Sequence, residues 1–161
     1  MNYSKKNMVL MVIKEVNPRD LKKIVYLEHQ IFKEDAFSKD LMEKFIAKNF
    51  LFLKLEISKL KKHLIGFIIV IKDQKEMVNI VNLLINPKFQ NKGYGSYLLQ
   101  QTIEKIKQLK NINKIVLNVQ ISNLIAIKLY EKFNFKKNPI VCENYYQSGE
   151  GAYLMELDIY S

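Results

Sequence analysis

The segment Asn86–Ser96, with the sequence NPKFQNKGYGS, decides the fold. It joins a β-branched run that ends at Ile85 to the stretch Tyr94–Leu109, where apolar residues recur with helical spacing. Two of the five glycines, Gly93 and Gly95, fall at this junction. Glycine lets the backbone approach a ligand closely, and a helix start presents unpaired N–H groups and a partial positive charge. The segment is therefore predicted to cradle a pyrophosphate, the alternative being a plain turn with a helix cap.

The spacing of the glycines argues against two common nucleotide motifs. Gly93–Leu98 lacks the third glycine of a dinucleotide fingerprint, and no acidic residue ends the next predicted strand to hold a ribose. A Walker loop would need Gly-Lys-Ser or Gly-Lys-Thr after four spacer residues, and this pattern is absent.

Predicted strands and helices alternate on both sides of this segment. Their order is a strand, two helices, three strands, a helix, a strand, a helix, and then one or two strands, with a right-handed βαβ unit around the glycines. The predicted strands are Val9–Lys14, Phe50–Ile57, Leu64–Ile71, Val78–Ile85, Lys114–Gln120 and Ala152–Ile159, with turns at Ser58–His63 and Asp73–Glu76. The helices are predicted to open at Pro18, Ser38, Tyr94, and Ser122 or Asn123, and Asn134 suits the left-handed residue that ends the last one.

Composition predicts a single domain over residues 1–161. Apolar residues make up 48% of the chain and charged residues 26%, as in soluble globular proteins. No apolar run approaches the roughly 20 residues that span a bilayer, and the amino-terminal stretch does not resemble a signal peptide. We therefore expect no membrane association. Cys142 is the only cysteine, so we expect a reducing, cytoplasmic setting.

The chain carries a formal net charge of +10. Such a surface favours anionic partners, such as CoA phosphates, RNA or the ribosome, although solvated lysine-rich faces are common. His29 and His63 are isolated in the sequence, and no Cys/His/Asp cluster has the spacing of metal ligands, so no metal site is expected.

Three motifs carry a resemblance to a known family. Gln90–Gly95 resembles the Arg/Gln-x-x-Gly-x-Gly/Ala loop of GNAT acetyltransferases, whose backbone amides bind the CoA pyrophosphate. Leu117–Asn123 followed by Ala126–Phe135 resembles the second acetyl-CoA segment of that family. Asn144–Tyr146 and Gly151–Met155 are similar to the closing segment of N-terminal acetyltransferases. The most similar subfamilies are the RimI-like ribosomal-protein alanine acetyltransferases, their archaeal relatives and the catalytic subunits of eukaryotic N-terminal acetyltransferases.

The resemblance implies an α/β GNAT fold. In this fold a mixed six- to seven-stranded sheet is flanked by about four helices around a central βαβ acetyl-CoA unit. The implied reaction transfers the acetyl group of acetyl-CoA directly to an amine, foremost the α-amino group of a ribosomal protein or nascent chain. The alternatives are a lysine side chain or a small amine as acceptor, or a non-catalytic acetyl-CoA-binding protein associated with the ribosome or RNA.

The same resemblance assigns candidate site residues. Tyr130 matches the family tyrosine beside the thioester sulfur, and a phenol with a pKa of about 10 suits donation to a thiolate. A core tyrosine is the alternative. Phe32, Tyr145 and Tyr146 are expected at the peptide entrance. The residues expected to bind acetyl-CoA, besides Tyr130, are Leu83, Leu84, Ile85, Gln90, Asn91, Lys92, Gly93, Tyr94, Gly95, Ser96 and Asn123.

The general base is the point at which the sequence departs from the RimI-like pattern. Those enzymes have a glutamate, proposed as the base, where this chain has Asn118. A neutral amide cannot take a proton; it can only hold a water or a carbonyl. Glu34 is the candidate substitute, the alternative being a solvated loop glutamate. A free α-amine, with a pKa of about 7.7–8.0, is about one-tenth neutral at pH 7, so acetylation of N-termini can proceed with a weak base.

Overall fold

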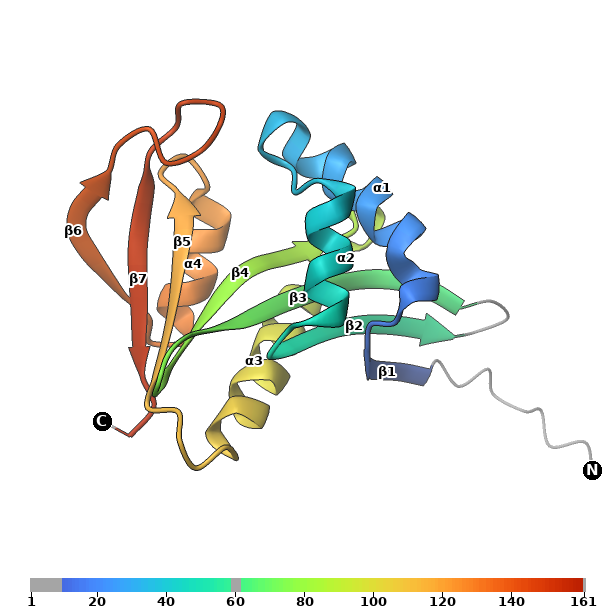
Figure 1. The fold of residues 1–161 in the computed structure, drawn as a ribbon, viewed down its shortest axis with the longest axis horizontal. Coiled ribbons are helices and arrows are strands. Elements are labelled where there is room, and N and C mark those ends of the chain that lie inside the picture. The colour runs from blue at the N-terminus through green and yellow to red at the C-terminus, as the bar shows by residue number, and fades with distance from the viewer. Residues whose placement is uncertain (1–9, 59–61, 161) are drawn as a thin grey trace, which may run out of the picture.

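The computed structural model describes residues 10–58 and 62–160. They form a seven-stranded mixed sheet in the order β1-β2-β3-β4-β5-β7-β6, in which β4 and β5 are parallel and the other neighbours antiparallel (Figure 1). The strands are β1 (Leu10–Glu15), β2 (Leu51–Ser58), β3 (Lys62–Gln74), β4 (Met77–Ile85), β5 (Lys114–Gln120), β6 (Lys136–Cys142) and β7 (Ala152–Asp158). The α-helices are α1 (Leu21–Phe32), α2 (Lys39–Ala47), α3 (Tyr94–Lys107) and α4 (Leu124–Lys132), and short 3₁₀ helices cover Pro18–Asp20, Lys33–Asp35 and Pro87–Phe89.

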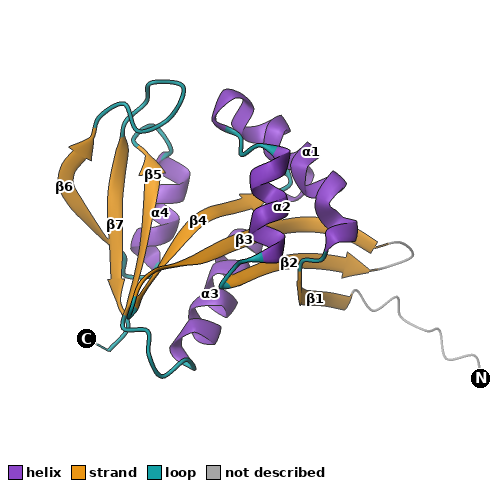
Figure 2. Ribbon diagram, in the orientation of Figure 1, coloured by secondary structure: helices purple, strands orange, loops and turns teal. Residues whose placement is uncertain are grey.

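Helices cover both faces of the sheet, α1 and α2 one face and α3 and α4 the other (Figure 2). Ile24 of α1 packs in one buried core with Phe67 of β3, whereas Leu98 of α3 packs in the other with Ile68. The alternation of β3 side chains between two cores explains why this strand reads as a continuous apolar run. Within the described residues, no helix is both long and apolar enough to cross a membrane.

Helix boundaries follow the sequence signals closely. The Ser38 side chain accepts a hydrogen bond from the Leu41 N–H at 3.2 Å and caps α2. Asn123, one of the two caps predicted for α4, accepts from the Ala126 N–H at 3.1 Å. Asn134 adopts a φ of 66° after α4, as predicted for the residue that ends it.

Several strand boundaries differ from the prediction. Strand β3 is longer than Leu64–Ile71, because Lys62 pairs with Ser58 at one end and Gln74 pairs with Met77 at the other. The predicted turns at Ser58–His63 and Asp73–Glu76 are correspondingly shorter, and residues 59–61 and Val9 lie outside the described residues. Phe50 and Ile159 lie just outside β2 and β7, and α3 ends at Lys107 instead of Leu109.

The sequence predicts one or two strands after α4 but gives no bounds for β6. This strand lies at the sheet edge, most of its residues are exposed, and it contains Pro139. An edge strand needs no apolar alternation and tolerates proline, so the sequence of β6 carries little strand signal.

Strands β4 and β5 separate after a short paired stretch, and this separation positions the site. They pair only from Met77–Lys114 to Ile80–Leu117. Immediately beyond, the register of β3 against β4 shifts so that Val81 is an extra, unpaired residue. Such a bulge bends a strand and increases its twist. The last residues of β4 and β5 therefore face each other across a gap, which is visible between the two arrows in Figure 1.

Candidate active site

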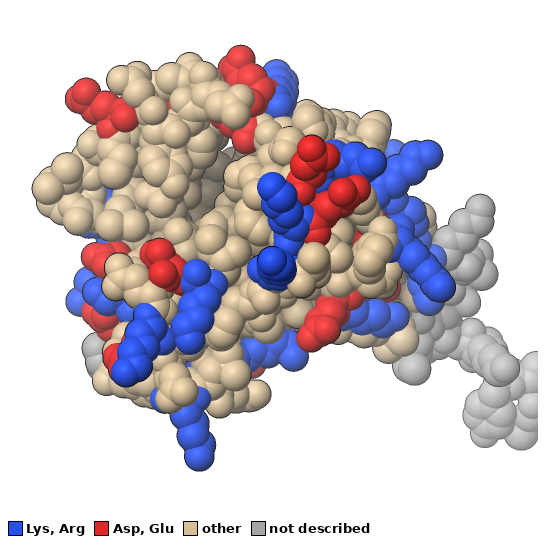
Figure 3. Space-filling view, in the orientation of Figure 1, with Lys and Arg blue, Asp and Glu red and all other residues tan. Residues whose placement is uncertain are grey.

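A cleft of about 800 Å³ opens between the separated ends of β4 and β5. Its walls come from α1 and the turn that follows it, from α2, from β4, from β5 with the start of α4, and from the β6–β7 loop. In Figure 3 it appears as a hollow between the charged surface of α1 and α2 and the largely uncharged side of β5 and β7. On this face, lysines are interspersed with acidic side chains and do not gather into one patch.

The glycine segment forms a loop at the end of β4 that suits a phosphate group. Gly93 caps α3 with a φ of 82°, and a Cβ atom placed on it would meet nothing within 4 Å. The open space lies at the N-terminus of a 14-residue helix, where unpaired N–H groups favour anions. The Gln90 side chain holds the loop by donating from Nε2 to the Ile85 carbonyl at 2.9 Å. These features fit the predicted pyrophosphate cradle.

The cradle lies beside the cleft and not in its lining. A Cβ on Gly95 would lie 3.6 Å from Ile85 at the end of β4 and 3.7 Å from Leu129 of α4, so the cradle sits against both elements. Along Leu83–Ile85, β4 pairs with β3 on one side, while its pairing with β5 has already ended. Apart from the Ile85 carbonyl, which accepts from Gln90, the other backbone edge of this stretch is thus available to an extended ligand running from the cradle into the cleft.

Tyr130 lies on α4 and lines the cleft with only 7% of its surface exposed. Its ring packs 5.7 Å from that of Phe135. Burial raises the pKa of its hydroxyl above the ordinary value, so this group stays protonated throughout the neutral range. Asn123 lines the same cleft about two turns earlier while its Oδ1 caps α4, so both of its expected roles are compatible.

Asn118 connects β5 to the tyrosine pair of the β6–β7 loop. Its Nδ2 donates to the Tyr145 hydroxyl at 3.0 Å, and the Tyr146 hydroxyl donates to its backbone carbonyl at 3.3 Å. The two tyrosine rings meet edge to face at 5.0 Å. Burial raises the pKa of both hydroxyls, so they are neutral groups of the wall. Phe32, the last residue of α1, also lines the cleft, so the structure brings the three predicted entrance residues together in one cleft.

Glu28 is a cleft residue that the sequence reasoning missed. It is 1% exposed, its Oε1 accepts from the Phe37 N–H at 3.1 Å, and its Oε2 accepts from Asn82 Nδ2 at 2.7 Å. Burial raises its pKa above the usual value. The Oδ1 atoms of Asn82 and Asn79 are buried and have no hydrogen-bond partner among the described residues. One sequence signal could have identified Glu28. It follows the buried Ile24 by four residues and therefore lies on the same inward face of α1.

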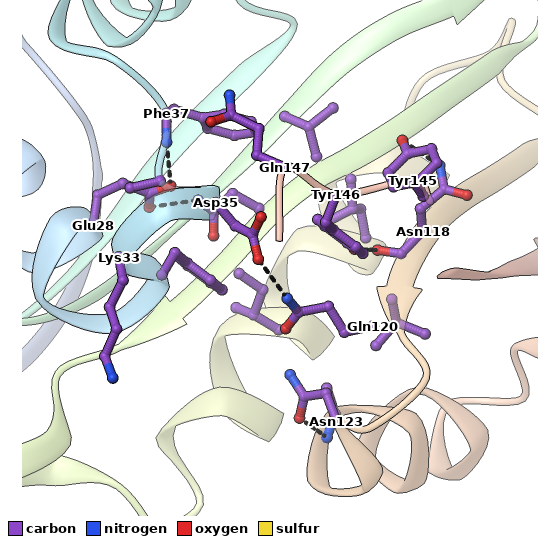
Figure 4. Close-up of a pocket in the computed structure, with 18 of the residues that line it drawn as sticks. Glu28, Lys33, Asp35, Phe37, Asn118, Gln120, Asn123, Tyr145, Tyr146 and Gln147 are labelled. Carbon is purple, nitrogen blue, oxygen red and sulfur yellow. Dashed lines mark hydrogen bonds between the residues drawn. The ribbon is translucent and has the colours of Figure 1, made fainter. Parts of the chain in front are cut away.

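Asp35 is the second missed residue, and it reaches across the cleft. Its Oδ2 accepts from Gln120 Nε2 of β5 and its Oδ1 from the Ser148 N–H of the β6–β7 loop, both at 2.9 Å. Figure 4 shows its side chain directed toward Gln120, away from α1. The neighbouring Glu34, which was the predicted substitute base, borders the same cleft but its side chain is exposed. Among the described residues, no group of His, Cys, Asp or Glu could hold a metal ion.

Comparisons with known proteins agree on one family. An N-alpha-acetyltransferase of Saccharolobus solfataricus is 39% identical over 77 residues, which cover 48% of this chain and 46% of that protein. A [ribosomal protein bS18]-alanine N-acetyltransferase of Salmonella typhimurium is 34% identical over 83 residues, which cover 50% and 55% of the two chains. The chain thus spans about half the length of these curated relatives.

The fold is also known from solved structures. NAA60 of Arabidopsis thaliana, solved in complex with acetyl-CoA, superposes with a TM-score of 0.84 at 17% identity, covering 94% of this chain and 100% of that one. The model of the acetyltransferase (GNAT) family matches residues 19–135, which include α1, the glycine segment, β5 and α4. The chain therefore belongs to the acetyltransferase (GNAT) family.

Proposed function

We propose that this protein transfers the acetyl group of acetyl-CoA directly to the α-amino group of a protein N-terminus. The observation that carries the proposal is the parting of β4 and β5, which leaves a phosphate cradle at one end and an entrance lined by Phe32, Tyr145 and Tyr146 at the other. The names of the Saccharolobus and Salmonella relatives support the acceptor class, and NAA60 with bound acetyl-CoA supports the donor.

The donor would be held by the chain's own backbone along its whole length. The N–H groups around Gly93 to Ser96 would bind the pyrophosphate, with Gln90, Asn91, Lys92 and Tyr94 shaping the loop. The free edge of Leu83–Ile85 would bind the pantetheine arm, with Asn123 on the other side. When bound, acetyl-CoA supplies an acetyl group activated as a thioester.

The chemistry requires a neutral amine and a protonated leaving group. As the nitrogen–carbon bond forms and the carbon–sulfur bond breaks, the phenol of Tyr130 gives its proton to the departing sulfur. Its buried position in the cleft keeps that proton in place until then. Asn118 fixes Tyr145 and Tyr146 at the entrance and does not itself take a proton.

Acceptor pKa values favour an N-terminus over a lysine side chain. At pH 7 about one α-amine in ten is neutral, against a few lysines in ten thousand. Strand β5 carries an amide at position 118 instead of a carboxylate, and such a site gains most from an acceptor that loses its proton easily.

The test measures thiol release from acetyl-CoA across a panel of hexapeptides with different first residues. Copies that are blocked at the α-amine but contain lysine serve as controls. We expect turnover on free N-termini and none on blocked peptides. Turnover on the blocked lysine peptides would make the protein a side-chain acetyltransferase, and silence on every peptide would favour a small-amine acceptor or a non-catalytic acetyl-CoA-binding protein.

We further propose that residues 1–161 act as one domain, that the protein works in the cytoplasm, and that its net charge of +10 supports contact with the ribosome. The lone cysteine is the support for the reducing compartment. Cosedimentation with ribosomes that weakens steeply with salt would support the contact, and cosedimentation that is absent at low salt would contradict it.

A further inference from the structure

The cleft contains a carboxylate on the wall opposite β5, away from Asn118, which occupies the expected position of the base. We propose that Asp35 is the catalytic carboxylate of this site: it receives the acceptor's ammonium group and takes the proton from its nitrogen. This inference rests on the proposed function, because it assumes an amine acceptor in the cleft. It identifies the general base on the turn after α1, on the wall opposite β5.

Asp35 is bound to a β5 side chain that neighbours the expected base position on the same face of the strand. Asp35 Oδ2 lies 2.9 Å from Gln120 Nε2, and Gln120 is two residues beyond Asn118 on β5. Side chains two residues apart in a strand lie on the same face, about 7 Å apart. Both Asn118 and Gln120 line the cleft. The Asp35 carboxylate therefore borders the space that a carboxylate at position 118 would serve.

Asp35 retains acceptor capacity after its bonds within the protein. A carboxylate offers about four lone-pair sites. Asp35 uses one on each oxygen, for Gln120 and for the Ser148 N–H. The remaining sites can accept an ammonium group, and the two bonds hold the carboxylate at the cleft; Figure 4 draws the one to Gln120.

The turn that carries Asp35 is held from both sides. It begins at Lys33, whose φ of 50° is unusual for a residue other than glycine and persists only where the surroundings impose it. It ends at Phe37, whose N–H donates to the buried Glu28. Glu28 is also bound to Asn82 of β4, so the sheet itself fixes the turn. Glu28 is thus a positioning residue for Asp35.

The proposed proton transfers balance. An acceptor that arrives as an ammonium loses one proton to Asp35, which releases it to water. When the neutral amine attacks, Asp35 takes the second proton from the nitrogen while Tyr130 protonates the sulfur. The proton on Asp35 then returns through solvent to Tyr130. The sum is one amide, one thiol and one proton released.

Other titratable groups surround Asp35 and must be considered in any pH profile. Tyr146 is close enough for Asp35 and Glu150 to contribute to its raised pKa, although burial is the main cause. Strand β5 and helix α2 contribute no titratable side chain to the cleft. The others that line it are Glu28 and His29 from α1, Lys33 and Glu34 from the turn, Tyr130 from α4 and Tyr145 from the β6–β7 loop.

The decisive variant is Asp35→Asn, because it separates charge from structure. The new amide can still accept from the Ser148 N–H and can donate to Gln120 Oε1 after an amide flip, so a merely structural bridge survives. We expect kcat/KM at pH 7 to fall about 100-fold, at the lower end of what general bases contribute. Asp40→Asn, an exposed change five residues away, is the matched control and should keep the wild-type rate.

The pH dependence of kcat/KM and a second substitution, which places a carboxylate at position 118, provide independent readouts. The loss of kcat/KM in Asp35→Asn, relative to the wild type, should shrink to about 10-fold or less at pH 9, where most α-amines are already neutral. Adding Asn118→Glu to Asp35→Asn should restore at least about tenfold, because it returns a carboxylate to the same space. A wild-type rate and profile in Asp35→Asn, or a loss in Glu34→Gln with none in Asp35→Asn, would overturn the assignment.

Peptide binding without any acetyl donor gives a readout that does not depend on turnover. Calorimetry would use the hexapeptide with the best turnover and its N-terminally acetylated copy. We expect Asp35→Asn to weaken binding of the free peptide about tenfold and to leave the acetylated copy unchanged. Equal weakening of both would indicate a structural role and overturn the inference. If the wild type turned over none of the hexapeptides, the proposed function itself would be contradicted. Failure of the proposed function can therefore be distinguished from failure of the Asp35 assignment.

Discussion

Replacement of Glu28 by glutamine and by alanine should have very different effects on stability. Glu28 is almost fully buried, and each of its oxygens accepts one hydrogen bond, from the Phe37 N–H and from Asn82 Nδ2. The Oδ1 atom of Asn82 is buried and finds no hydrogen-bond partner in the part of the chain that the structure describes. An Asn82 amide flip would therefore let a glutamine at position 28 donate to Oδ1 while its own oxygen still accepts from Phe37.

The magnitudes follow from counting these partners. Glu28→Ala leaves one buried and one part-buried donor unsatisfied, at about 1–3 kcal/mol each, and opens a cavity, so we expect a loss of about 3–5 kcal/mol in the free energy of unfolding. Glu28→Gln keeps both hydrogen bonds and removes a buried charge, so its free energy of unfolding should stay within about 1 kcal/mol of the wild type at neutral pH.

The pH dependence provides the sharper comparison. Burial raises the pKa of Glu28 above its ordinary value of 4.5, so the folded state binds more protons than the unfolded state between these two values. Stability contributed by the protonated form is complete below pH 4.5 and is lost as pH rises to the folded pKa. The free energy of unfolding of the wild type, relative to Glu28→Gln, should therefore fall across this window and then level off.

Urea unfolding of the wild type and both variants at several pH values from about 4 to 8 would measure these differences. The glutamine variant is the control for burial and shape, since only the titrating charge is removed. The reasoning fails if Glu28→Gln is as destabilised as Glu28→Ala, because hydrogen-bond replacement would then not operate. It also fails if the difference between wild type and Glu28→Gln does not change with pH.

Three further predictions concern the donor side and the sheet. Tyr130→Phe should lower kcat about 100-fold while CoA affinity by calorimetry stays unchanged, and an unchanged kcat would remove Tyr130 as the acid. Gly93→Ala should cost about 1 kcal/mol of stability at its φ of 82° and weaken CoA binding at least severalfold, whereas unaltered affinity would argue against the cradle. Gly66→Ala should destabilise the fold by about 1–3 kcal/mol in urea, because its Cβ would collide with the Leu84 carbonyl; wild-type stability would mean that β3 and β4 can move apart.

Local signals account for the parts of the fold that the sequence predicts well. The Gly93 junction, the helix caps at Ser38 and Asn123, and the left-handed Asn134 are each decided by residues within one turn of chain. Strand β6 is different, because an exposed edge strand is specified by its neighbour in the sheet. The bulge at Val81 likewise depends on how β3 and β4 align, so the gap at the site has no local signature.

The candidate site likewise contains residues with a local sequence signal and residues without one. The cradle and Tyr130 sit in motifs whose spacing is visible in the chain. Asp35 is separated from Gln120 by 85 residues and from Ser148 by 113, and nothing in the turn itself distinguishes it from Glu34. Only the direction of the turn after Lys33 decides which carboxylate enters the cleft. Sequence reasoning therefore named Glu34, whereas the contacts across the cleft lead us to propose its neighbour Asp35 on the same turn.

A base on the turn after α1 would connect acceptor binding to catalysis more tightly than a base on β5. A side chain on β5 is fixed by the sheet whether or not an acceptor is present. Asp35 instead keeps its place through Gln120 and Ser148, two contacts that span the cleft an acceptor must enter. An N-terminus that fits beneath this bridge meets a carboxylate already oriented, whereas one that displaces it loses its proton acceptor. Selection among N-termini would then act on the chemical step as well as on binding.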